Sequence, residues 1–228
     1  SFKHIEAGAK KVIVSAPCRD ADQTVVYGVN HKNISKTDHI ISVASCTTNC
    51  LAPLAFAIHK NFKIEKGYMT TIHSYTTDQR LLDNSHKDLR RARSAPNAMV
   101  PTSTGAAKSL KMIIPELANK IDGVSIRVPT PNVSLVQLSF NSKKKITKEK
   151  INSSLIKASK TYLKKVLGVE QKPLVSSDFN HDPRSSIIDT GLTKVIGNNF
   201  ATVFAWYDNE WGFSNRMIDM SLVLKNKI

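Results

Sequence analysis

The sequence has few cysteines, few acidic residues and no long hydrophobic run, and each shortage excludes a class of protein. Its three cysteines, Cys18, Cys46 and Cys50, form an odd set without a repeated spacing, which argues against a disulfide framework and favours a reducing, cytoplasmic location. No leader-like start precedes them. Lysines interrupt every apolar stretch before it reaches the roughly 20 residues of a membrane-spanning helix. No histidine has a second ligand at a zinc-like interval, so we expect no metal site.

A Gly-x-Gly-x-x-Gly motif, with which many dinucleotide-binding domains hold a pyrophosphate, is also missing. Gly8 follows a helix-like start and precedes a strand-like segment, which is typical of a helix C-cap. Gly8 is therefore interpreted as a structural turn and not as part of a dinucleotide cradle.

Acidic residues are outnumbered, with 18 Asp and Glu against 33 Lys and Arg, which gives a formal net charge of +15. Such a field attracts phosphates and nucleic acids. The densest lysine run, residues 143–145, falls in a polar stretch without the interleaved aromatic residues of a nucleic-acid site, so we interpret it as a solvated turn. Binding to RNA or to a surface is kept as an alternative function. Arg90, Arg91 and Arg93 lie in a long loop, which favours anion binding.

Strand-like and helix-like segments alternate along the 228 residues, and the hydrophobic content of 41% is enough for a substantial core. Residues 74–104 are polar and irregular, and a loop of that length is usually functional. Pro53 should bend or weaken the helix that contains it. Helices are expected at residues 51–58, 105–114, 147–167 and from 211 onward. Strands are expected at residues 12–14, 24–27, 40–43, 68–73, 124–128, 133–140, 174–179, 186–189, 194–196 and 202–207.

The candidate chemistry lies where a strand-like stretch leads into a helix. Ser45 is expected to be the N-cap, which places Cys46 on the first turn. Unpaired backbone N–H groups and the helix macrodipole favour a thiolate at that position. His73, at the end of the next strand, could hold the thiolate as an ion pair or accept a proton from an adduct. The pattern predicts covalent catalysis by Cys46 and His73 on an electrophilic carbon.

Seven motifs, spread over essentially the whole chain, strongly resemble those of phosphorylating glyceraldehyde-3-phosphate dehydrogenases. The motifs are GAKKVIVSAP at residues 8–17, ASCTTNCLAP at 44–53, TTIHSYT at 70–76, DLRRAR at 88–93, TGAAK at 104–108, RVPTPNV at 127–133 and WYDNE at 206–210.

This resemblance implies an α/β chain with an α+β catalytic domain, built on a large mixed, mostly antiparallel sheet with helices on one face. Residues 1–44 would be the C-terminal part of a Rossmann-type NAD-binding domain, residues 45–206 the catalytic domain, and residues 207–228 a helix that packs back on the NAD-binding domain. The first half of the cofactor domain would lie outside this chain, together with the acidic residue that holds the adenosine ribose.

The implied activity is the oxidation and phosphorylation of glyceraldehyde 3-phosphate to 1,3-bisphosphoglycerate with NAD, in glycolysis and in a cytoplasmic homotetramer. NADP stays open, because the ribose-binding residue is outside the chain. Cys46 would form a thiohemiacetal and then a thioester, with His73 as the base. The enzymatic alternative is erythrose-4-phosphate dehydrogenase, which Tyr75, Thr76 and residues 104–108 disfavour.

The remaining site residues follow from the resemblance, position by position. Residues 75–99 would form the loop that lines a neighbouring subunit's cofactor pocket. Cys50 would pack near Cys46, where oxidation could join the two, and Cys18 would be a surface thiol. Val43 and Phe213 depart from the family's usual asparagine and tyrosine. The assigned residues are Thr76 and Arg127 for the substrate phosphate, Ser45, Thr47, Arg93, Thr104 and Gly105 for inorganic phosphate, and Ser15 and Asn209 for the cofactor.

Overall fold

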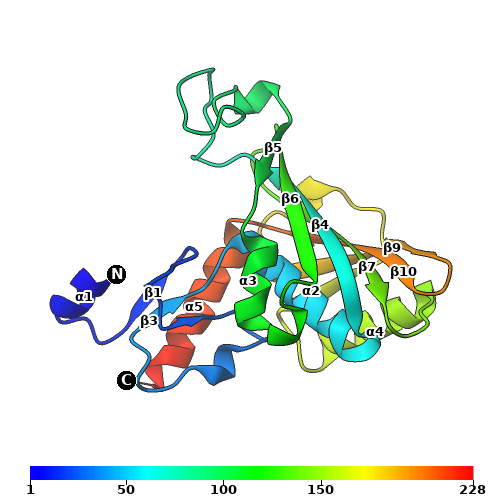
Figure 1. The fold of residues 1–228 in the computed structure, drawn as a ribbon, viewed down its shortest axis with the longest axis horizontal. Coiled ribbons are helices and arrows are strands. Elements are labelled where there is room, and N and C mark those ends of the chain that lie inside the picture. Colours follow the sequence, from blue (N-terminus) through cyan, green and yellow to red (C-terminus); the bar gives the residue numbers. More distant parts are fainter. Residues whose placement is uncertain (228) are drawn as a thin grey trace.

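The computed structural model in Figure 1 describes residues 1–227, which form two β-sheets with helices packed against them. The helices are α1 (Phe2–Glu6), α2 (Cys46–Phe62), α3 (Ala106–Ile113), α4 (Lys148–Lys160) and α5 (Trp211–Lys225). Short 3₁₀ helices lie at His31–Asn33, Ala95–Asn97, Pro115–Leu117 and Ser176–Phe179. The strands are β1 (Val12–Val14), β2 (Gln23–Thr24), β3 (Ile40–Ser42), β4 (Ile64–Ser74), β5 (Val100–Ser103), β6 (Ile121–Val128), β7 (Ser134–Ser142), β8 (Leu167–Glu170), β9 (Ser186–Ile196) and β10 (Phe200–Tyr207).

The larger sheet has seven strands in the order β5-β6-β4-β7-β10-β9-β8. Its pairs β5–β6, β4–β7, β7–β10 and β9–β10 are antiparallel, while β4–β6 and β8–β9 are parallel. Along β7, fully buried residues alternate with half-buried ones, which indicates that helices cover one face of the sheet. The predicted fold class, a mixed and mostly antiparallel sheet with helices, is confirmed.

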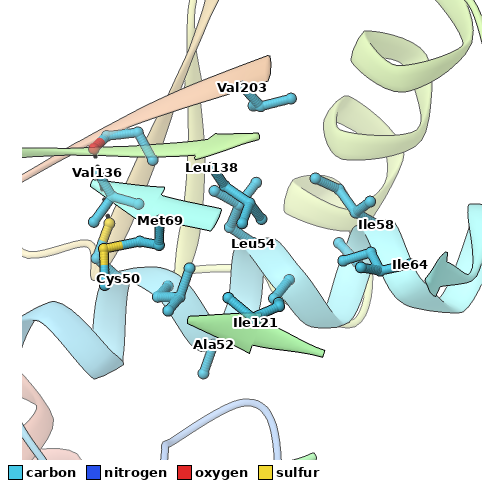
Figure 2. Packing of buried hydrophobic residues seen from close by; sticks show 14 of the residues in the cluster. Cys50, Ala52, Leu54, Ile58, Ile64, Met69, Ile121, Val136, Leu138 and Val203 are labelled. Atoms are coloured by element: carbon cyan, nitrogen blue, oxygen red, sulfur yellow. Dashed lines mark hydrogen bonds between the residues drawn. The ribbon is translucent and has the colours of Figure 1, made fainter. Parts of the chain in front are cut away.

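The main core lies between this sheet and α2, α3 and α4 (Figure 2). Leu54 and Ile58 of α2 meet Met69 of β4 and Leu138 of β7 in one buried cluster. The helix runs unbroken through Pro53, which is itself buried, so tertiary packing outweighs the missing backbone hydrogen bond. This helix is longer than residues 51–58, because its first turn begins at Cys46.

The smaller sheet, in the order β1-β3-β2, is parallel and lies at the amino-terminal side of α2. Val25, Ile41 and Val43 of this region form a second core cluster with Met220 and Leu224 of α5. The carboxyl-terminal helix therefore packs against the amino-terminal segment of the chain, as Figure 1 also shows.

Two helix and strand predictions are corrected by the structure. The helix expected at 147–167 ends at Lys160, since Thr161 leaves helical geometry with φ −120° and ψ −105° and Leu167 enters β8. The strand expected at 174–179 is wrong. Its second half is a 3₁₀ helix, in which the Asp178 carboxylate accepts the Val175 N–H at 2.8 Å.

The strand pattern also differs at two places. The segments expected at 186–189 and 194–196 belong to one strand, β9, which a bulge interrupts where the Asp189 carboxylate accepts the N–H groups of Gly191 and Leu192. The irregular loop expected at 74–104 contains a further strand, β5, at the edge of the sheet. Pro101 hides that strand from a sequence pattern, because proline is tolerated only at an edge.

Gly8 fits its expected role at the end of α1. It lies just beyond the C-cap Ala7, has φ +98°, and donates its N–H to the Ile5 carbonyl at 2.9 Å. Within residues 1–227, no helix combines the length and the apolar character needed to cross a membrane.

We expect Leu54→Ala to lower the free energy of unfolding by about 2 to 5 kcal/mol, because it leaves a cavity in the main core. Leu222→Ala is the matched control, since Leu222 is 60% exposed on α5, and it should change stability by less than about 0.5 kcal/mol. Urea denaturation followed by tryptophan fluorescence measures both. Equal effects of the two substitutions would contradict this description of the core.

Candidate active site

The candidate site lies at the first turn of α2, where the turn from β3 enters the helix. Ala44 has φ +59° there, a left-handed conformation that a non-glycine residue adopts only when its surroundings enforce it. Ser45 is the N-cap, as predicted, and its Oγ accepts the Thr48 N–H at 3.1 Å. The tight turn places Cys46 at the first helical position, close to the end of the larger sheet.

Cys46 lies against His73, which β4 carries one residue before its end. The Cys46 Sγ is 3.4 Å from the His73 Nε2. His73 is only 2% exposed, while Cys46 is partly exposed. The structure thus brings together two residues that are 27 positions apart in sequence, and the sulfur keeps access to a ligand.

The other ring nitrogen of His73 faces both an acceptor and a donor. Its Nδ1 is 2.7 Å from the Ser74 carbonyl oxygen and 2.8 Å from the Arg127 Nη1. Arg127 is adjacent because β4 and β6 pair in parallel with His73 opposite Arg127. A proton on Nδ1 is donated to the Ser74 carbonyl, and this tautomer leaves Nε2 free to accept a proton from Cys46.

Burial sets the protonation of the pair. It lowers the pKa of His73 to about 3, and the Arg127 cation adds to that effect. Burial also raises the pKa of the Cys46 thiol, which the Arg127 cation and hydrogen bonds from Thr47 only partly oppose. The expectation that the helix terminus would favour a thiolate is therefore corrected, since desolvation outweighs it. A neutral thiol beside a neutral imidazole is the arrangement for proton transfer to a general base.

A chain of hydroxyl groups borders the pair on its other side. The Tyr207 hydroxyl lies 2.9 Å from both Thr47 Oγ1 and Thr71 Oγ1, and the Tyr207 ring meets the His73 ring edge-on with centroids 5.9 Å apart. Thr47 is thereby held next to Cys46. Sequence reasoning singled out neither Tyr207 nor Thr71 as a site residue, because the contacts join positions far apart in the chain.

The other two cysteines have different surroundings. Cys50 is fully buried one turn after Cys46, and its thiol donates weakly to Ser186 Oγ at 3.6 Å and to the Ala205 carbonyl at 3.8 Å. Burial raises the pKa of Cys50 far above that of a free thiol. Cys18 is partly exposed, at 3.9 Å from Ser1 Oγ.

The residues expected to bind phosphates are only partly gathered around the thiol. Thr76 is engaged with Gln79, whose side-chain oxygen accepts its N–H and hydroxyl at 2.9 and 3.2 Å. Arg93 is 68% exposed and pairs with Asp83 at 3.3 Å. Thr104 accepts the Ala106 N–H at 3.2 Å, and Gly105 caps α3. In the described part of the chain, no hydrogen bond links these four residues to Cys46 or His73.

The residues expected to bind a cofactor lie on either side of α2. Ser15 is exposed just after β1. Asn209 is buried between β10 and α5, where its Oδ1 accepts from Ser74 Oγ at 2.9 Å and from Ser134 Oγ at 2.8 Å. Val43 and Phe213 both pack in the second core cluster.

The chemistry of these donors suits a nicotinamide group, because the Asn209 amide can donate to a carboxamide oxygen. Among residues 1–227, no three His, Cys, Asp or Glu side chains gather in a way that could hold a metal ion.

Comparison with known proteins identifies relatives over nearly the whole chain. The family described as "Glyceraldehyde 3-phosphate dehydrogenase, C-terminal domain" matches residues 45–209. The glyceraldehyde-3-phosphate dehydrogenase of Cereibacter sphaeroides is 54% identical over 221 residues, which are 97% of this chain and 66% of that protein. The enzyme of that name from Zymomonas mobilis is 56% identical over 218 residues, 95% of this chain and 65% of the relative. The chain thus spans just under two thirds of the length of these relatives.

We expect His73→Ala to slow alkylation of Cys46 by iodoacetamide at neutral pH by at least about tenfold, because the only base within reach of the thiol is removed. Mass spectrometry of each cysteine gives the rates. His39→Ala is the control, since His39 is an exposed histidine that contacts the Lys10 carbonyl. Cys50 should remain unmodified throughout because it is buried. Unchanged Cys46 rates in His73→Ala would refute the base assignment.

Arg127→Gln should move the alkylation profile of Cys46 to higher pH. Burial dominates at both groups, but the Arg127 cation lowers the pKa of Cys46 and of His73, so its removal raises both. More alkaline conditions are then needed to form the thiolate. The pH at half-maximal alkylation measures the shift, with the exposed Arg19→Gln as control. A shift toward lower pH would show that the cation does not act on this pair.

Proposed function

The chain belongs to the glyceraldehyde-3-phosphate dehydrogenase family, and from that premise we propose that it carries the catalytic part of an NAD- or NADP-dependent phosphorylating aldehyde dehydrogenase. The observation that carries the proposal is the 3.4 Å approach of Cys46 Sγ to His73 Nε2 at the start of α2. A thiol with a base in reach and a cation on the far side of that base suits covalent attack on an aldehyde.

In the proposed reaction, His73 Nε2 accepts the Cys46 proton as the sulfur attacks the aldehyde carbon of glyceraldehyde 3-phosphate. The thiohemiacetal oxygen takes that proton, and His73 removes it again as the carbon is oxidised to a thioester. The bound nicotinamide ring supplies the acceptor for the hydride. Inorganic phosphate then attacks the thioester, which releases 1,3-bisphosphoglycerate and returns the sulfur to its thiol form through His73.

Two anion sites would serve the two phosphates. Arg127 and Thr76 are proposed for the substrate phosphate, because Arg127 is half-buried beside His73 and its Nε is buried without a partner among the described residues. Ser45, Thr47, Arg93, Thr104 and Gly105 are proposed for inorganic phosphate. Thr47 supports this best, since Tyr207 holds its hydroxyl next to the sulfur.

The cofactor would lie between Ser15 and Asn209, over Cys46. Ser15 ends the small sheet and Asn209 ends the large one, so both sheets would contribute to its binding. NAD is proposed first. NADP stays open, because the residue that would distinguish the ribose groups is expected outside the chain.

The domain division is proposed on the same basis, with residues 1–44 and 207–228 as parts of the NAD-binding domain and residues 45–206 as the catalytic domain. The packing of α5 on the small sheet supports it. The loop between β4 and β5 projects from the body of the molecule in Figure 1 and exposes Leu81, Leu82, Leu89 and Met99. Such apolar exposure supports a homotetramer in which this loop is covered. Glycolysis in the cytoplasm is the matching role.

The alternatives are weaker. The relatives reported above are all called glyceraldehyde-3-phosphate dehydrogenase, so erythrose-4-phosphate dehydrogenase is not favoured. Binding to RNA or a surface rests on the net charge of +15 alone.

The test is turnover by a protein that joins this chain to the amino-terminal part of the cofactor domain. With glyceraldehyde 3-phosphate and NAD but no phosphate, we expect one equivalent of reduced cofactor per active site, and continuous turnover once phosphate is added. Cys46→Ser should lower kcat by more than about a thousandfold, because the covalent route is lost. Cys18→Ser is the control and should keep full activity. Continuous turnover in Cys46→Ser, or faster oxidation of erythrose 4-phosphate by the parent, would refute the proposal.

A further inference from the structure

Three buried polar residues meet behind the candidate site and have no role in the chemistry described so far, apart from the expected cofactor contact of Asn209. Ser74 ends β4, Ser134 begins β7, and Asn209 lies in the turn between β10 and α5. Their exposed fractions are 0%, 1% and 5%. Polar groups buried to that degree are normally arranged so that every donor has an acceptor.

The hydrogen bonds of this cluster run in one direction only. The Ser134 Oγ accepts the Ser74 backbone N–H at 3.1 Å and donates its own proton to Asn209 Oδ1 at 2.8 Å. The Ser74 Oγ donates to the same oxygen at 2.9 Å. A flipped Asn209 amide would turn its NH₂ group toward these hydroxyls and leave both serine protons without an acceptor. The two serines therefore fix which end of the amide faces away from them.

The end that faces away is the NH₂ group. Within residues 1–227 its one partner is the carboxylate of Glu210, an exposed residue, at 3.3 Å. Asn209 consequently offers a donor, and no acceptor, to a ligand. A group that binds there must present an oxygen acceptor.

We propose that Ser74 and Ser134 are positioning residues for the cofactor, which hold Asn209 so that it selects the carbonyl oxygen of the nicotinamide carboxamide. This inference rests on the proposed function. It also explains a shared residue: the Ser74 carbonyl oxygen lies 2.7 Å from His73 Nδ1, so one residue orients the catalytic base and the amide that holds the ring. The ring and the base are thereby placed relative to each other.

The test compares cofactor analogues by calorimetric titration of the full-length protein. Three ligands are used: NAD, the acetylpyridine analogue, which keeps the carbonyl oxygen but lacks the NH₂ group, and the thionicotinamide analogue, which replaces that oxygen with sulfur. The parent protein should bind the acetylpyridine analogue more tightly than the thionicotinamide analogue, because sulfur is a weak acceptor.

In the Ser74→Ala/Ser134→Ala double variant, we expect NAD binding to weaken about fivefold and the preference between the two analogues to fall toward one, because the amide can then present either end. Ser134→Thr keeps a hydroxyl and should restore the preference. Ser139→Ala is the matched control, since Ser139 lies on the same strand and its hydroxyl pairs with Thr202 at 2.8 Å, away from the site.

An unchanged analogue preference in the double variant would overturn the inference, even if binding of NAD or the melting temperature dropped, because that result would mean a structural role only. If the double variant does not fold, Ser74→Ala alone gives the same comparison, since Ser134 then still accepts the Ser74 backbone N–H. A parent protein that binds neither NAD nor NADP would overturn the proposed function and this inference with it. The two failures are therefore distinguishable.

Discussion

Burial of helix α2 is the constraint on which the rest of the structure depends. Most of its residues, from Thr47 to Phe62, are buried, so the helix forms the centre of the main core and cannot be moved without opening it. Its first residue is Cys46. The position of the sulfur is therefore set by the packing of the whole helix against the larger sheet and by the strained turn at Ala44. A nucleophile held in this way loses little entropy on reaction.

The same burial determines the electrostatics of the site. It disfavours both the thiolate of Cys46 and the imidazolium of His73, so an ion pair at rest would have to overcome two desolvation costs. Arg127 acts in opposite senses on this pair, since its cation stabilises a thiolate but repels a second positive charge. A ligand anion on Arg127 would reduce that repulsion. The substrate phosphate could thus make His73 a better base as it binds, which links recognition with reactivity.

Polar groups around the pair compensate for their burial by binding one another. Tyr207 joins Thr47 to Thr71, and Ser134 joins Ser74 to Asn209. Each group connects strands of the larger sheet with the segment on which a site residue lies, so the sheet itself orients the site. Long-range contacts of this kind have no periodicity in the sequence, which is why Tyr207, Thr71 and Ser134 were not recognised there as site residues.

The sequence by itself determined the alternation of helices and strands, the N-cap at Ser45, and the pairing of Cys46 with His73, because capping and periodicity are local and the motifs are specific. It predicted a strand at 174–179 and missed β5 at Val100–Ser103, since edge strands and 3₁₀ turns depend on neighbours distant in the chain. Only the tertiary structure decided the protonation of the catalytic pair, the place of Arg127 opposite His73, and the orientation of Asn209. Those properties arise from burial and strand register, which exist only once the chain has folded.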